Sequence, residues 1–296
     1  MKILITGGSG LVGRKLIDRL EEAGHDCRIL SRSPGEKRIQ WDPDAEVLKA
    51  GEIEAFDGVI HLAGENIASG RWTENAKRRI YDSRIKGSEL LSRTIQQLEN
   101  PPQFFISASA IGYYGNRGNE RLTEESPAGQ GFLAKTCVDW EASVQGLKDR
   151  GLRVCWLRIG VVLSPDGGAL QKMLLPFKLG LGGRLGDGKQ FWSWIDIEDL
   201  VRSLEYLAFN ERLEGVFNGT APEALPQAEF GRILSKKLKR PAILPAPAWG
   251  LKLLLGEMAE ALLLSSARVE PTRLIQNGFQ FKYPRLEDSL EHLLRS

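Results

Sequence analysis

Three glycines near the N-terminus strongly restrict the folds open to this chain. Residues 6–13 read TGGSGLVG, with Gly7, Gly10 and Gly13 in the spacing GxxGxxG. The short apolar run Lys2–Thr6 precedes them, and the amphipathic stretch Leu11–Ala23 follows. Glycine lets the chain turn sharply, lets the backbone approach a pyrophosphate, and lets a helix pack closely on a strand. A strand, a glycine turn and a helix in this order predict a dinucleotide-binding βαβ unit.

The alternation of strands and helices continues beyond this unit. Further short apolar runs, typical of strands buried on both faces, are Cys27–Leu30, Arg38–Trp41, Gly58–Leu62, Gln103–Ser107 and Arg153–Ile159. Helical patterns lie between several of them, at Thr73–Leu98 and Phe132–Arg150. This alternation predicts an α/β fold with a Rossmann-like, doubly wound parallel sheet and right-handed crossovers.

The pattern changes after Gly160. Residues 164–190 are rich in glycine and form a long excursion, of the kind that often carries function. A helix is expected over Asp196–Asn210 and a strand over Gly215–Asn218. We predict a dinucleotide-binding domain of residues 1–165 plus 190–221. Residues 166–189 plus 222–296 would form a smaller, mostly helical substrate-binding part.

Within this smaller part, residues 222–296 show three helical stretches separated by proline-rich turns. Its most apolar segment, Trp249–Leu264, contains three charged residues and is shorter than the ~20 residues of a membrane span. We therefore predict an amphipathic, mostly buried helix there.

Composition and charge exclude several classes of protein. A net charge of +2 gives no basic footprint for nucleic acid. Three scattered cysteines and three histidines, without metal-ligand spacing, make a disulfide framework, a zinc site or another metal site unexpected. Glycines interrupt the first apolar run at once, so no targeting segment is recognised. We expect a cytoplasmic protein, a monomer or a homodimer, with a small-molecule substrate and with neither nucleic acid nor a membrane as partner.

The end of the second predicted strand indicates which nucleotide is bound. An NAD site usually has a carboxylate there to accept a hydrogen bond from the ribose 2′-hydroxyl. This chain has Ser31 and Arg32 and no carboxylate. A hydroxyl and a guanidinium suit a 2′-phosphate. The sequence therefore favours NADP(H) over NAD(H).

Motifs over nearly the whole chain resemble one family. They include HLAGENI at 61–67, SASAIGYYG at 107–115, LRIGVVL at 157–163, FNGTAP at 217–222 and GFQFKYP at 278–284. With the glycine motif they resemble the atypical extended short-chain dehydrogenases/reductases called epimerase family proteins, within the NAD-dependent epimerase/dehydratase-like group. The resemblance implies cofactor contacts near Leu62 and Ala63, at Arg84 and near Val162. The full set of expected cofactor-binding residues is Gly7, Gly10, Leu11, Val12, Gly13, Ser31, Arg32, Leu62, Ala63, Gly64, Arg84, Ser107 and Val162.

One departure from the superfamily pattern affects the chemistry. The superfamily uses a tyrosine and, four residues later, a lysine for proton transfer. In the matching pattern YxxxKxxxxE, this chain has Phe132, Thr136 and Glu141. Lys135 is adjacent, but on a helix it points about 100° away. Because a phenyl ring cannot donate a proton, the standard mechanism does not transfer to these positions.

Other residues are candidates for the missing acid. Ser109, which ends a predicted strand at the edge where ligands bind, is the candidate for the hydroxyl that polarises the substrate carbonyl, although Ala110 matches the register equally well. Tyr113 or Tyr114 is an alternative acid, unless Tyr114 only shapes a loop. Glu65 follows another strand and is a third candidate, unless it pairs with an arginine, Arg79 or Arg84.

A substrate pocket is expected around two tryptophans. Trp192 and Trp194 share one face of an extended segment and would wall the pocket with Lys189 and Tyr113, unless the tryptophans are core residues. Together these features predict an NADP(H)-dependent oxidoreductase or epimerase acting on a small carbonyl or sugar-like substrate. The alternative is an NADP(H)-binding sensor with little turnover, which the loss of tyrosine and lysine favours.

Overall fold

Seven parallel strands form the centre of the molecule, in the order β11-β7-β5-β4-β1-β2-β3. The computed structural model describes residues 1–295. The strands of this sheet are β1 (Lys2–Thr6), β2 (Asp26–Ser31), β3 (Arg38–Gln40), β4 (Gly58–His61), β5 (Phe104–Ala110), β7 (Arg153–Ile159) and β11 (Gly215–Gly219). The predicted doubly wound, Rossmann-like sheet is confirmed.

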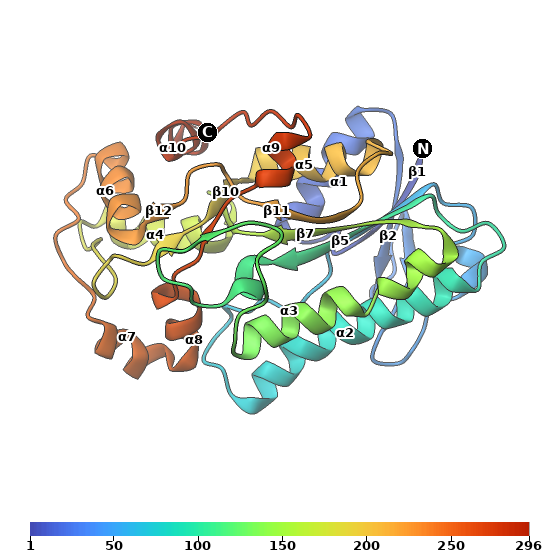
Figure 1. Ribbon diagram of the computed structural model, residues 1–296, viewed down its shortest axis with the longest axis horizontal. Coiled ribbons are helices and arrows are strands. Elements are labelled where there is room, and N and C mark those ends of the chain that lie inside the picture. Colours follow the sequence, from blue (N-terminus) through green and yellow to red (C-terminus); the bar gives the residue numbers. More distant parts are fainter. Residues whose placement is uncertain (296) are drawn as a thin grey trace.

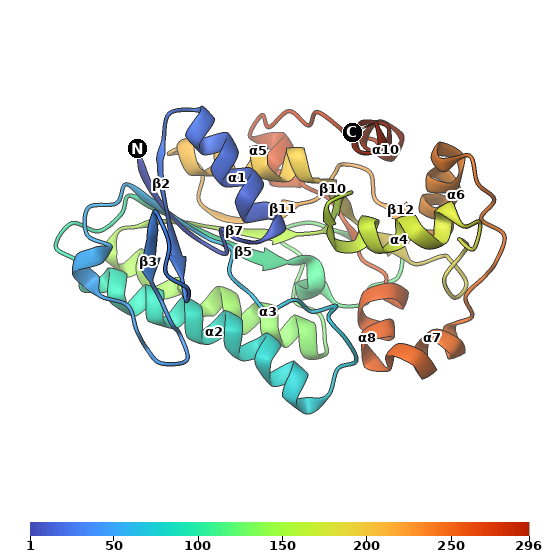
Figure 2. The same cartoon turned by 180° about the vertical axis from the view of Figure 1, so that it is seen from behind.

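Helices cover both faces of the sheet (Figures 1 and 2). On one face lie α1 (Leu11–Glu22) and α5 (Ile197–Phe209), and on the other α2 (Glu74–Gln96) and α3 (Phe132–Ala142). The side chains of β1 alternate between the two layers. Ile3 and Ile5 join the apolar cluster under α1 and α5, whereas Leu4 joins the cluster on the opposite face. Because both faces are buried, the strand sequence is almost continuously apolar.

Most of the remaining elements extend the molecule to one side of the sheet (Figure 1). The short strands are β6 (Arg121–Leu122), β8 (Val161–Ser164), β9 (Phe191–Trp192), β10 (Trp194–Asp196), β12 (Leu225–Pro226) and β13 (Arg268–Val269). The helices are α4 (Gly168–Lys178), α6 (Gln227–Leu238), α7 (Ala248–Leu255), α8 (Glu257–Ala259), α9 (Thr272–Gln276) and α10 (Leu286–Leu294). A π-helical turn, Glu260–Leu264, follows α8.

Three sequence predictions about helices are corrected. The helix expected over 132–150 ends at Ala142, and a separate 3₁₀ turn covers Gln145–Arg150. Residues 222–295 hold five α-helices rather than three helical stretches. The segment Trp249–Leu264 is not one buried helix, because Gly256, with φ +65°, separates α7 from α8.

Helix α7 also differs from the prediction in its burial. The side chains of Trp249 and Leu253 are each 73% exposed. The apolar character of this segment therefore reflects a surface rather than a core. Within residues 1–295, no helix is both long and apolar enough to cross a bilayer.

Candidate functional site

The glycine turn between β1 and α1 has no room for side chains. A Cβ on Gly13 would lie 2.2 Å from the carbonyl oxygen of Gly7, and one on Gly7 would lie 2.8 Å from the backbone of Leu62. Gly7 also has φ +69°, which favours glycine. Helix α1 begins after Gly10 without a side-chain cap and without an acidic residue in its first turn. Its first amides, those of Leu11, Val12 and Gly13, are therefore open to an anion.

The loop after β4 is tied to the glycine turn. The hydroxyl oxygen of Thr6 accepts hydrogen bonds from the amides of Leu62 and Ala63, each at 3.0 Å. These two amides are thus already engaged. Leu62 and Ala63 consequently lie against the glycine turn, and their expected contact with the cofactor stays a prediction.

The end of β2 presents a free guanidinium. Arg32 is exposed and, among the residues described, forms neither a hydrogen bond nor an ion pair. The hydroxyl of Ser31 accepts a hydrogen bond from the amide of Ser33 at 3.1 Å. An unpaired arginine at this strand end is available to an incoming phosphate.

Arg84 on α2 lies under the loop that follows β4. Its guanidinium donates to the carbonyl oxygens of Ile80 and Glu65, at 2.8 and 3.1 Å, and stacks over Trp140. Burial lowers the pKa of Arg84. A Cβ on Gly64 would lie 3.2 Å from the guanidinium carbon, so Arg84 and Gly64 form one tight contact.

Glu65 pairs with Arg79, one of the two arginines that the sequence offered as partners. Its carboxylate lies 3.8 Å from Nε of Arg79, and both side chains are exposed. A long, exposed pair of this kind leaves the carboxylate free to exchange partners.

Ser107 and Ser109 lie on β5, which ends at Ala110, and both are buried. The Ser109 hydroxyl donates to Glu141 at 2.7 Å, and Ser109 is only 2% exposed. Glu141 in turn binds Arg158 through two hydrogen bonds of 2.8 Å. Ser107 is fully buried, and its hydroxyl donates to the carbonyl oxygen of Ala108. Ser109 therefore belongs to a buried ion-pair network and does not fit the role of a carbonyl-polarising hydroxyl.

Tyr114 is also part of that network. Its hydroxyl donates to Asn218 at 2.7 Å and accepts from Arg158 at 3.1 Å. The side chain is fully buried, and burial raises the pKa of Tyr114 to about 12. With no exposed surface, the phenol cannot reach a substrate. The loop-shaping alternative fits Tyr114 better than the role of an acid.

Tyr113 is in a different position. It is only partly buried, and its hydroxyl makes no hydrogen bond to the described residues. The guanidinium carbon of Arg158 lies 3.3 Å from the centre of its ring. Arg158 therefore fixes the orientation of the ring while the hydroxyl stays free.

The position of the superfamily tyrosine is occupied by a packed phenyl ring. Phe132 contacts Trp72 edge to face, with ring centres 5.4 Å apart. Thr136, one turn later, is buried and donates to the carbonyl oxygen of Phe132. Lys135 points away and pairs with Asp139. Neither Phe132 nor Thr136 supplies an acid.

Sequence reasoning missed a charged pair beside Phe132. The ammonium of Lys77 on α2 lies 5.8 Å from the centre of the Phe132 ring and 2.6 Å from the carboxylate of Glu257 on α8. This pair joins residues 180 positions apart in the sequence, and no local motif marks it. It brings the C-terminal helices to the N-terminal end of α3.

The residues expected around the substrate divide into two groups. Trp192 and Trp194 are 7% and 0% exposed and belong to the main apolar cluster, as the core alternative held. Neither indole N–H has a hydrogen-bond partner within residues 1–295. Lys189 is exposed. Val162, which was expected near the cofactor rather than the substrate, lies on β8 beside Ile195 of β10.

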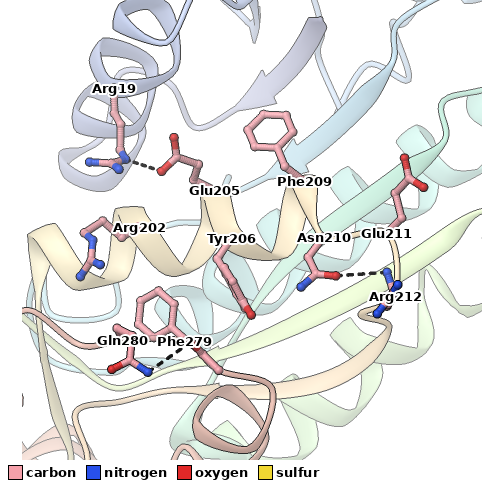
Figure 3. Close-up of a pocket in the computed structure, with 11 residues that line it drawn as sticks. Arg19, Arg202, Glu205, Tyr206, Phe209, Asn210, Glu211, Arg212, Phe279 and Gln280 are labelled. Atoms are coloured by element: carbon pink, nitrogen blue, oxygen red, sulfur yellow. Dashed lines mark hydrogen bonds and ion pairs between the residues drawn. The ribbon is translucent and has the colours of Figure 1, made fainter.

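A groove of about 810 Å³ lies elsewhere, between α1, α5 and residues 278–280 (Figure 3). Phe209 in its wall stacks on His25, which precedes β2, and contacts Phe104, the first residue of β5. The groove thus sits where the strands begin, whereas the glycine turn sits where they end. No group of three or more potential metal ligands occurs among the described residues.

Comparisons with known proteins agree with this geometry. The model of the "NAD dependent epimerase/dehydratase family" matches residues 3–218, and a domain of unknown function matches residues 246–293. Epimerase family protein SDR39U1 of Mus musculus is 37% identical over 99% of this chain and 100% of its own length. Epimerase family protein YfhF of Bacillus subtilis is 36% identical over 99% of this chain and 98% of its own.

Solved structures show the same relationship. Human epimerase family protein SDR39U1, crystallised with NADPH, superposes with a TM-score of 0.94 at 33% identity, and each chain is covered completely. A nucleoside-diphosphate sugar epimerase from Corynebacterium glutamicum superposes with a TM-score of 0.84 at 32% identity, over 99% of this chain and 58% of its own. The chain belongs to the NAD-dependent epimerase/dehydratase family.

Proposed function

We propose that this protein binds NADP(H) and acts as an oxidoreductase or epimerase on a small carbonyl or sugar-like substrate. The glycine turn is the observation that carries the proposal. A Cβ on Gly7 or Gly13 would clash with neighbouring backbone, so the tight turn requires glycine there, and the uncapped start of α1 offers amides to a pyrophosphate. The related human protein that was crystallised with NADPH supports the same cofactor.

Arg32 supports NADP(H) over NAD(H). A guanidinium binds a phosphate through charge-assisted hydrogen bonds, whereas a ribose 2′-hydroxyl needs an acceptor. Arg32 has no partner among the described residues, and no carboxylate ends β2. We assign Arg32 and Ser31 to the 2′-phosphate, and residues 7–13 to the pyrophosphate.

When bound, the nicotinamide supplies or accepts the hydride. The protein must then hold the substrate and move one proton. Tyr113 is the best candidate for the proton because its hydroxyl is free and its ring is held by Arg158. Glu65 is the second candidate, since only a distant arginine pairs with it.

A sensor with little turnover is the competing function. The packed ring of Phe132 and the buried hydroxyl of Thr136 favour it, because they replace the two groups on which superfamily turnover depends. Such a protein would keep the glycine turn and Arg32 but would not need a free acid.

Calorimetric titration with NADPH, NADP⁺, NADH and NAD⁺ tests the cofactor, after the purified protein has been checked for nucleotide already bound. We expect micromolar or tighter binding of the phosphorylated forms only. No binding of any nucleotide would overturn both functions. A subsequent screen of carbonyl substrates, with NADPH oxidation as the readout, separates enzyme from sensor.

A further inference from the structure

Exposed apolar side chains are concentrated at one end of the molecule. Eleven large hydrophobic residues are exposed among those described, and eight of them lie within residues 167–186 and 230–256. We call these eight the apolar patch: Leu175, Leu179, Leu181, Ile243, Leu244, Trp249, Leu253 and Leu254. Isolated exposed apolar residues are normal in soluble proteins, but a concentration of this kind marks an interaction surface.

The two segments that carry the apolar patch run side by side. The amide of Leu244 donates to the carbonyl of Gly182 at 3.3 Å, and that of Ala246 to Arg184 at 2.9 Å. Figures 1 and 2 place α4, α7 and the loop between α6 and α7 at the end of the long axis remote from β3. The patch is therefore one region of surface assembled from two parts of the chain.

Charge is distributed unevenly around the apolar patch. Residues 167–186 and 230–256 contain no Asp or Glu, although the whole chain has a net charge of only +2. They contain nine basic residues: Lys172, Lys178, Arg184, Arg232, Lys236, Lys237, Lys239, Arg240 and Lys252. Only Arg232, Lys237 and Lys252 form ion pairs with described residues. Of the other six, Lys172 donates to the carbonyl oxygen of Ala68 at 2.7 Å, and the remaining five charges are available to an anionic partner.

We propose that the apolar patch and its basic surroundings bind the surface of an anionic lipid bilayer. Exposed leucines and a tryptophan enter the headgroup region, while lysine and arginine contact acidic headgroups. Trp249, which begins the exposed face of α7, is the residue type preferred at that depth. A second copy of this chain would bring the same basic residues against one another.

The protein would lie on the membrane rather than cross it, because no described helix is long and apolar enough to span. This proposal revises the expectation that the chain has no membrane partner. It does not depend on the proposed catalytic function, since none of its residues is assigned to the cofactor or the proton.

Sedimentation with vesicles tests the proposal. The full chain is mixed with vesicles of phosphatidylcholine alone or of phosphatidylcholine with phosphatidylserine, at low and high salt. We expect binding to the anionic vesicles only, and weaker binding at high salt because screening reduces the attraction. Failure to bind anionic vesicles at low salt would overturn the proposal.

Two pairs of variants locate the surface. Lys239→Glu with Arg240→Glu should lower the partition coefficient of the protein onto anionic vesicles at least about tenfold, since each basic residue near the surface strengthens membrane binding about fivefold. Lys49→Glu with Arg93→Glu makes the same change of charge at positions outside the patch and should have little effect on vesicle binding. Trp249→Gln with Leu253→Gln should also abolish binding.

Val138→Gln with Ile275→Gln is the matched control for the apolar change, because both residues are exposed outside the patch. Thermal melting and NADPH titration show whether each variant is folded. Equal loss in patch and control variants would overturn the assignment. The proposal would also be overturned if the wild-type protein failed to bind vesicles and light scattering showed a dimer that Trp249→Gln with Leu253→Gln dissociates. That result would mean that a second copy of the chain occupies the apolar patch.

Discussion

The hydroxyl of Thr6 lies 2.7 Å from Nδ1 of His61, and this contact orders a buried chain of hydrogen bonds. Because Thr6 already accepts from the amides of Leu62 and Ala63, its proton points to His61. Nε2 of His61 lies 3.0 Å from Ser88, whose hydroxyl donates to the carbonyl of Arg84. Nε2 must therefore carry the proton, and the imidazole is neutral. The chain links the ends of β1 and β4 to α2, beside the glycine turn.

Protonation of His61 should destabilise the protein. Burial lowers the pKa of His61 from its ordinary 6.5 to about 4. The unfolded chain thus binds this proton at a higher pH than the folded protein does. The stability that comes from the neutral, buried His61 is therefore complete above pH 6.5 and is lost as the pH falls towards 4. The free energy of unfolding decreases by about 3 kcal/mol over this range.

Urea denaturation at several pH values measures this loss. His61→Gln should have a lower free energy of unfolding at pH 7, and a smaller decrease between pH 6.5 and 4 than the wild type. Parallel pH profiles for the two proteins would show that His61 is not the titrating group.

Arg32→Asp should separate the two nucleotides. The loss of a charge-assisted contact to the 2′-phosphate, with a carboxylate in its place, should weaken NADPH binding by about 2 kcal/mol or more. That is at least about thirtyfold in Kd. NADH has no 2′-phosphate and should lose much less. Calorimetry with both nucleotides decides, and an equal loss for both would contradict the assignment.

Gly13→Ala should disrupt the nucleotide site. The new Cβ would lie 2.2 Å from the carbonyl oxygen of Gly7 and 2.8 Å from Cα of Gly8, so the backbone must move. We expect a loss of about 1–3 kcal/mol in stability and of measurable NADPH binding. Gly51→Ala is the control, because no atom lies within 4 Å of its Cβ position. Wild-type affinity in Gly13→Ala would exclude this turn as the pyrophosphate site.

The two adjacent tyrosines should respond differently to loss of their hydroxyls. Tyr113→Phe should keep the melting temperature and NADPH affinity but lose turnover of any substrate found. Tyr114→Phe leaves the buried Oδ1 of Asn218 without its donor and removes one of the acceptors of Arg158, and should cost about 1–3 kcal/mol in stability. Retained turnover in Tyr113→Phe would remove Tyr113 as the acid and leave Glu65 to be tested.

Removing one member of the buried ion pair should be costly. Arg158→Met leaves Glu141 without its guanidinium in an interior site and should cost about 3–5 kcal/mol. Replacing both, as Arg158→Met with Glu141→Leu, should recover part of that loss because no charge remains unpaired. Thermal and urea unfolding of the three proteins test this, and a double variant less stable than Arg158→Met would contradict it.

Local sequence patterns determined the nucleotide-binding half of this protein. The glycine spacing, the strand before it and the helix after it lie within thirty residues, so short-range sterics and periodicity suffice to predict them. The candidate role of Arg32 was predicted in the same way, because it depends only on the position of Arg32 directly after β2. Strands buried on both faces were recognised for a similar reason, because their apolar character is nearly continuous.

Only the tertiary structure decided which polar groups are free. Ser109 and Tyr114 have the right chemistry and sit at the right strand end, but their hydroxyls bind Glu141 and Asn218, 32 and 104 residues away. Likewise, α7 has the apolar composition of a core helix, yet Trp249 and Leu253 face solvent. Composition shows what a residue can do, whereas its partners, contributed by distant parts of the chain, determine whether it is available to do it.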